Sequence, residues 1–224
     1  MSVLSVQSVS YSYKTKYQTV HAVKDVSCDL SAGTLYALVG KSGSGKTTLL
    51  SLLAGLDTPQ SGDIMVNGQS LRETDVDIYR RKQASVIYQS YNLFPLMTVC
   101  ENVMYPLKLL RHSDADAKKE AQIVLEKVGL GESYWKRLPA MLSGGEQQRV
   151  AIARALAVHA QIILADEPTG NLDTENSTQI IQLLSRLAHE ENCCVVVVTH
   201  DLEVAKAADV VFRMDSGRIK EETV

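Results

Sequence analysis

The sequence lacks the long apolar segment that a membrane-spanning helix needs. No apolar run in its 224 residues approaches the roughly 18 residues that cross a bilayer. The N-terminal residues alternate polar and apolar side chains, without the basic and apolar blocks of a secretory signal peptide. We therefore expect a cytosolic protein.

Cysteine pairs with the Cys-x-x-Cys spacing of metal sites, and a strong charge of one sign, are also missing. The four cysteines, Cys28, Cys100, Cys193 and Cys194, show no Cys-x-x-Cys spacing, so we expect reduced core thiols and no metal cluster. A net charge of −3 gives no overall field that would attract nucleic acid, and we expect no such partner. The contents of 45% hydrophobic and 22% charged residues are ordinary for a globular protein. The length suits one large domain or two small ones.

A glycine-rich loop is the most informative feature that is present. Gly-Lys-Ser-Gly-Ser-Gly-Lys-Thr-Thr, from Gly40, fits the phosphate-loop pattern, and it lies between an apolar strand at 35–39 and a helix at 47–54. Glycines let the backbone N–H groups curl toward phosphate oxygens, a lysine supplies positive charge, and a threonine hydroxyl can bind Mg²⁺. An ordinary Gly/Ser turn is the alternative, but we predict nucleoside triphosphate binding. The predicted binding residues are Gly40, Lys41, Ser42, Gly43, Ser44, Gly45, Lys46, Thr47 and Thr48.

The residues before this loop predict an antiparallel sheet. Residues 2–13 and 22–30 alternate polar and apolar side chains, and a polar turn at 14–18 joins them. An aromatic side chain shortly before the loop can stack on an adenine base. Tyr13 is the candidate and Tyr11 its rival, although either can be an ordinary sheet tyrosine.

Polar side chains follow three apolar strands further along the chain. Gln89 follows 86–88, Asp166 and Glu167 follow 162–165, and His200 follows 193–199. Ligands of α/β folds bind at the carboxyl ends of strands. One carboxylate of the acidic pair can bind Mg²⁺ while the other accepts a proton from an attacking water. A lone histidine or glutamine is usually structural, but we expect all four of these polar residues to lie at the same edge of the sheet.

Residues 90–155 contain no strand pattern and predict a helical insertion. The connector Ser90–Met97 is unusually apolar, and helices are expected at 98–110 and 114–128. Ser143-Gly144-Gly145-Glu146 fits a capping box ahead of a helix that runs to about 158. The glycines leave the helix N-terminus bare, as a close approach to phosphate requires.

These motifs together resemble the ATP-binding subunits of ATP-binding-cassette (ABC) transporters over nearly the whole chain. The most specific is Leu142–Arg149, which is similar to the family signature and stands in the expected order among the other motifs. The resemblance implies an α/β fold: a RecA-like P-loop NTPase core with an N-terminal antiparallel β subdomain and an inserted α-helical subdomain. We expect one domain, 1–224, with the core at 1–89 and 156–224 and the helical signature subdomain at 90–155.

The resemblance also implies roles for single residues. Lys46 and Thr47 would hold the ATP phosphates and Mg²⁺, with Gln89 and Asp166 completing the metal site. The catalytic residues would be Glu167, as the base that polarises water, His200, at the γ-phosphate, and Lys46. A head-to-tail dimer would close over two ATP molecules, with Asp173 (in Asn171-Leu172-Asp173) communicating across the interface. The signature residues that bind the nucleotide of the opposite subunit would be Ser143, Gly144, Gly145 and Glu146.

The resemblance finally implies a membrane partner. Ala165–Asp173 and Tyr91–Pro95 are similar to the macrolide, lipoprotein and peptide exporters (MacB/LolD-like) and to their cell-division relative FtsE. The chain would then be an ATPase at the inner face of the membrane that drives a separate permease; the alternative is an ATPase that gates its partner without transport. A soluble DNA-repair or translation ATPase would carry a coiled coil or a second cassette. The expected permease-docking residues, with subdomain core as the other interpretation, are Tyr91, Leu93, Phe94, Leu96 and Met97.

Overall fold

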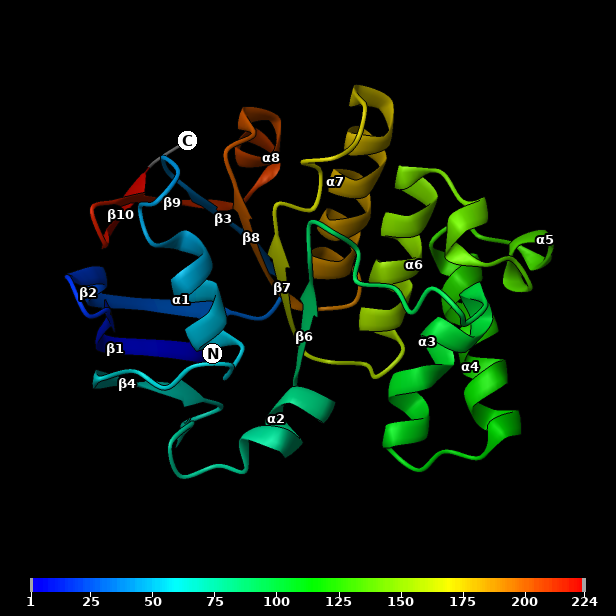
Figure 1. Ribbon diagram of the computed structural model, residues 1–224, viewed down its shortest axis with the longest axis horizontal. Helices are drawn as coiled ribbons and strands as arrows, with labels where there is room; N and C mark the ends of the chain where they lie inside the picture. Colours follow the sequence, from blue (N-terminus) through cyan, green and yellow to red (C-terminus); the bar gives the residue numbers. More distant parts are fainter. Residues whose placement is uncertain (1, 223–224) are drawn as a thin grey trace.

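Two β-sheets and a group of helices make up residues 2–222, the part of the chain that the computed structural model describes (Figure 1). The larger sheet has six strands in the order β10-β9-β3-β8-β7-β6, parallel except for β10. Every parallel strand therefore ends at the same edge. The strands are β3 (Thr34–Val39), β6 (Ala84–Ile87), β7 (Ile162–Asp166), β8 (Cys194–Thr199), β9 (Val210–Asp215) and β10 (Arg218–Glu222).

The smaller sheet is antiparallel and precedes the larger one in the chain, as the alternation of the N-terminal residues predicts. Its order is β2-β1-β4-β5, with β1 at Ser2–Lys14, β2 at Thr19–Ser31, β4 at Ser61–Val66 and β5 at Gln69–Ser70. The second strand begins three residues before the predicted start at 22, because Thr19, Val20 and His21 continue the hairpin ladder while remaining exposed. Because all three residues are exposed, alternating burial is absent from the start of β2.

The two faces of the large sheet bury two separate hydrophobic cores. Tyr36 and Leu38 point into a core shared with the small sheet and with α1 (Lys46–Leu53). Leu35, Ala37 and Val39 point into the opposite core, which α7 (Thr174–His189) and the helical insertion cover. Because both faces are buried, the central strands are apolar throughout, as the sequence of 162–165 predicts.

The segments α3 to α6, with the 3-10 turn η1 between α5 and α6, form a group beside the sheet (Figure 1, green to yellow). The predicted inner face of 114–128 is confirmed: Ala117, Ala121, Val124 and Leu125 are buried. One detail differs from expectation. The last helix ends at Leu156 and not near 158, since His159 takes a left-handed φ of 51°. The segments are α3 (Val99–Leu109), α4 (Asp114–Lys127), α5 (Glu132–Trp135), the 3-10 turn η1 (Pro139–Met141) and α6 (Gly144–Leu156).

Two short helices complete the fold. The helix α2 (Val76–Lys82) was not predicted, since it is short and charged, although Asp75 caps it by accepting from the N–H groups of Asp77 and Ile78. The other is α8 (Leu202–Ala207), and the closing hairpin of β9 and β10 follows it. Within residues 2–222, no helix combines the length and apolar character that crossing a bilayer requires.

Candidate nucleotide-hydrolysis site

The phosphate loop connects the end of β3 to the start of α1. Gly43 and Gly45 adopt φ angles of 77° and 109°, a region that L-residues with a Cβ rarely enter. A Cβ on Gly40 would lie 2.3 Å from the carbonyl oxygen of Met214, and one on Gly45 would lie 2.0 Å from that of Ala22. The loop thus requires glycine for its conformation and for its close contact with β2 and β9.

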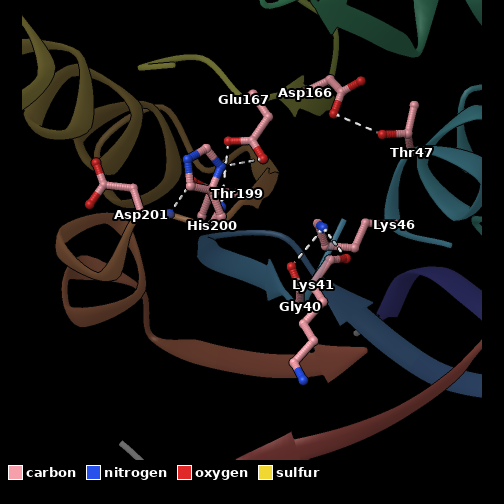
Figure 2. Close-up of polar contacts among 9 residues, drawn as sticks. All are labelled: Gly40, Lys41, Lys46, Thr47, Asp166, Glu167, Thr199, His200 and Asp201. Carbon is pink, nitrogen blue, oxygen red and sulfur yellow. Dashed lines mark hydrogen bonds and ion pairs between the residues drawn. The ribbon is translucent and has the colours of Figure 1, made fainter. Parts of the chain in front are cut away.

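Lys46 lies folded across this loop. Its Nζ donates to the carbonyl oxygens of Gly40 (2.8 Å) and Lys41 (3.1 Å), and the side chain is largely buried (Figure 2). The ammonium group therefore lies beside the loop backbone, within reach of a phosphate bound by the loop.

A cavity of about 710 Å³ opens over the loop, large enough for a nucleotide. Tyr13 lines it, 44% exposed, with its hydroxyl 3.3 Å from Oγ1 of Thr48. Tyr11 instead donates to Asp57 (3.3 Å) and meets the Tyr13 ring edge-on. Tyr13 is thus the tyrosine that faces the cavity. The remaining lining residues are Val20, Ala22, Gly40, Lys41, Ser42, Gly43, Gly45, Lys46, Thr47, Thr48, Glu167 and His200.

Thr47 and Asp166 meet beside the loop. Thr47, in the first turn of α1, donates from Oγ1 to Oδ1 of Asp166 at the end of β7 (3.2 Å). Burial raises the pKa of Asp166; the Thr47 hydrogen bond opposes this rise and the neighbouring Glu167 carboxylate adds to it. A cation placed between these oxygens would relieve the cost of burying the charge.

Glu167 and His200 form a second pair at the same edge of the sheet. Oε1 of Glu167 lies 2.9 Å from the ring nitrogen Nδ1 of His200, and the backbone N–H of His200 also donates to Oε2 of Glu167 (3.4 Å). Glu167 has a left-handed φ of 47°, and its own N–H donates to the carbonyl of Val198 (2.9 Å). Figure 2 shows Glu167 pointing toward His200 while Asp166 points the other way, toward Thr47.

Gln89 lies farther along this edge. Its backbone carbonyl accepts from Nδ2 of Asn171 (3.1 Å), and a Cβ on Gly170 would lie 2.8 Å from its Nε2. Its side chain therefore packs against the turn that follows Glu167. Among the described residues, no hydrogen bond joins the Gln89 side chain to Thr47 or Asp166.

The signature residues begin α6 and do not line the cavity over the phosphate loop. The predicted capping box is present: Ser143 Oγ accepts from the Glu146 N–H (3.3 Å) and Glu146 Oε2 accepts from the Ser143 N–H (2.7 Å). The latter bond chiefly lowers the pKa of Glu146. A Cβ on Gly145 would lie 2.3 Å from Oδ1 of Asn176, so α7 packs closely against the signature residues.

Asp173, three residues before Asn176, caps α7. Its carboxylate accepts from the backbone N–H of Asn176 (2.8 Å) and from Nδ2 (2.9 Å), and these bonds lower its pKa.

The apolar segment Tyr91–Met97 connects β6 to α3. Leu96 is 91% exposed and Phe94 is 38% exposed, whereas Leu93 is half-buried against the core. Sequence reasoning missed the two side chains that hold this segment. Asn102 of α3 and Arg154 of α6 bind its backbone. A lone arginine among the alanines of an amphipathic helix was the available signal for Arg154.

Comparison with known proteins gives a consistent result. The family model described as ABC transporter matches residues 23–170. The lipoprotein-releasing system ATP-binding protein LolD of Syntrophotalea carbinolica is 42% identical over 221 residues, which cover 97% of each chain. The macrolide export ATP-binding/permease protein MacB of Syntrophobacter fumaroxidans is 38% identical over 228 residues, but the match covers only 32% of that longer protein.

Among solved structures, the dimeric ABC transporter cassette MJ0796 superimposes with a TM-score of 0.90 at 36% identity, over 98% of both chains. The same cassette has been solved as a dimer in a post-hydrolysis state bound to ADP and phosphate, with the same TM-score of 0.90.

Proposed function

The chain belongs to the ABC transporter family as one of its ATP-hydrolysing cassettes, and we propose that it drives a separate membrane permease. Two polar pairs beside the phosphate loop support ATP hydrolysis, and the similarity to the ATP-binding protein of a lipoprotein-releasing system supports a separate permease. Thr47–Asp166 and Glu167–His200 bring a candidate metal-binding pair and a candidate base to one edge of the sheet. Such a pairing suits phosphoryl transfer to water.

ATP is the substrate that fits the cavity. The loop N–H groups and the N-terminus of α1 would bind its phosphates. Lys46 would exchange the carbonyls of Gly40 and Lys41 for phosphate oxygens. The exposed ring of Tyr13 would stack on the adenine.

Mg²⁺ suits the Thr47–Asp166 pair. Both side chains offer oxygen ligands, and this cation commonly takes one or two protein ligands together with substrate phosphates. Gln89 is a further candidate ligand. Bound there, the cation would neutralise charge on the phosphates.

The chemical step falls to Glu167. Its carboxylate would accept a proton from the water that attacks the γ-phosphate. His200, 2.9 Å away, would hold that carboxylate in position and reach the γ-phosphate with its other ring nitrogen.

One chain supplies an incomplete site. Ser143, Gly144 and Gly145 lie outside the phosphate-loop cavity, and the Glu146 carboxylate is engaged in the capping box. We assign these signature residues to the ATP held by a second copy, so that two copies close head-to-tail over two ATP molecules. Asp173, which is hydrogen-bonded to the Asn176 side chain that packs against Gly145, would transmit changes across that interface.

The permease would dock beside Tyr91–Met97. A groove of about 490 Å³ lies next to this segment, between α2 and α3. Phe94, Leu56 and Leu109 line it and are each at least 38% exposed. An apolar helix of the permease would bury them, and the other predicted docking residues of the segment, Tyr91, Leu93, Leu96 and Met97, would complete the contact. This arrangement places the chain at the cytoplasmic face of a membrane, powering an exporter or extractor of the lipoprotein, peptide or macrolide kind.

The test is steady-state ATP hydrolysis by the wild-type chain and by Glu167→Gln, alone and with membranes that contain a candidate permease. We expect one permease to stimulate the wild type and to leave the variant inactive. Full wild-type activity that no permease changes would contradict a coupled motor. Stimulation without movement of any substrate would favour the gating alternative.

A further inference from the structure

The helix that carries the signature also holds the docking segment, Tyr91–Met97, at its other end. Arg154, in the last turn of α6, donates from Nη2 to the carbonyl of Tyr91 (2.9 Å) and from Nη1 to that of Asn92 (2.6 Å). Its guanidinium carbon lies 5.9 Å from the centre of the Phe94 ring. One planar group therefore engages three residues of the segment, which a lysine ammonium cannot match.

The backbone of Tyr91 and Asn92 has an unfavourable conformation that other contacts must stabilise. Tyr91 and Asn92 adopt consecutive left-handed φ angles of 60° and 48°, which residues with a Cβ adopt at an energetic cost. Such a conformation persists when surrounding contacts determine it. The two bonds from Arg154 end on the carbonyls of these same two residues.

The segment touches the first turn of α6 as well. A Cβ on Gly144 would lie 2.9 Å from the hydroxyl oxygen of Tyr91. Tyr91 thus contacts α6 at both ends of the helix, with its hydroxyl near Gly144 and its carbonyl bound by the extended Arg154 side chain. Gly144 and Arg154 are ten positions apart, or about 15 Å along the axis. The helix and the segment are joined at two points.

We propose that Arg154 is a positioning residue that makes the docking segment and α6 move as one body. This inference rests on the proposed function, because it connects the signature, at the ATP of the second copy, to the surface assigned to the permease. A movement of α6 toward bound ATP then displaces Tyr91–Met97, and a permease that displaces the segment moves the signature.

Leu96 offers a place to observe the segment. It is 91% exposed, so Leu96→Cys can carry an environment-sensitive fluorophore in a Glu167→Gln chain. Three native cysteines are buried and Cys28 is half-buried, and the same chain without Leu96→Cys measures their labelling. We expect ATP with Mg²⁺ to dimerise this parent chain and to change the emission of the label.

Three variants of the labelled parent then test Arg154. Arg154→Met should lose the emission change while still dimerising with ATP, and Arg154→Lys should keep only part of it. Arg80→Met is the matched control: Arg80 lines the same groove but donates to the carbonyl of Gly55 (2.6 Å), so its loss should leave the response unchanged.

A full response in Arg154→Met, or no response in a parent that dimerises, would overturn the proposal. If Arg154→Met does not fold, Arg154→Lys decides, and an undiminished response there would also overturn it. A parent that binds ATP yet stays monomeric would contradict the proposed function instead, and the size measurement separates these cases.

Discussion

Replacing Asn102 by alanine should destabilise the protein far more than a typical polar substitution. Asn102 lies on α3 and is fully buried. Its Oδ1 accepts from the N–H of Phe94 (2.8 Å). Its Nδ2 donates to three carbonyl oxygens, those of Phe94 (3.1 Å), Met97 (3.0 Å) and Thr98 (3.0 Å).

The magnitude follows from the groups that lose a partner. The carbonyls of Phe94 and Thr98 also accept from the N–H groups of Met97 (3.2 Å) and Asn102 (2.9 Å), so they stay bonded. The N–H of Phe94 and the carbonyl of Met97 lose their hydrogen bonds to Asn102. Each unsatisfied buried group costs about 1–3 kcal/mol. We expect the free energy of unfolding to fall by about 2–6 kcal/mol, a large part of the roughly 5–15 kcal/mol of a typical domain.

Urea unfolding followed by circular dichroism measures this change. The control is Gln182→Ala on the exposed side of α7, which should stay within about 0.5 kcal/mol of wild type. A loss below about 1 kcal/mol for Asn102→Ala would refute the reasoning, because it would mean that water replaces the amide at no net cost.

Three further predictions concern the nucleotide site. Tyr13→Ala should weaken ATP binding by about 1–3 kcal/mol in a titration, whereas Tyr11→Ala should not; equal losses would remove Tyr13 from the adenine site. Asp166→Asn should abolish hydrolysis yet stabilise the nucleotide-free chain at neutral pH. Burial raises the pKa of Asp166, so the native protein favours the protonated carboxyl and pays to keep it ionised at pH 7. The gain in stability from asparagine should vanish as the pH falls below the pKa that Asp166 has in the unfolded chain. A denaturation midpoint that does not rise at pH 7 would contradict this sign. Gly45→Ala should fold poorly or bind no ATP, given its φ of 109° and the 2.0 Å approach to Ala22; near-normal binding would show that the loop has another conformation.

Local patterns predict the strand-end residues well. Buried parallel strands are continuous apolar runs, so the positions of Asp166, Glu167 and His200 follow from where those runs stop. The inner face of α4 follows equally from helical spacing. These features depend on residues adjacent in the chain, and the structure places them at the expected edge of the sheet.

Contacts between distant segments could not be predicted in this way. Arg154 binds carbonyls that lie 62 and 63 positions earlier in the chain. The positions of Gln89, beside Gly170, and of Asn176, against Gly145, likewise depend on how separate elements pack. The helix α2 escaped prediction because it is short and mostly exposed, with Tyr79 as its one buried residue.

The most direct measurement of the central claim, that two copies share each ATP site, is the mass of the Glu167→Gln chain in solution with and without ATP. We expect a monomer alone and a dimer with ATP. Ser143→Asp in the same chain should prevent dimerisation without loss of ATP binding, because aspartate caps α6 as well as serine does but repels the γ-phosphate. A chain that binds ATP and remains monomeric, or one that dimerises regardless of Ser143→Asp, would contradict the claim.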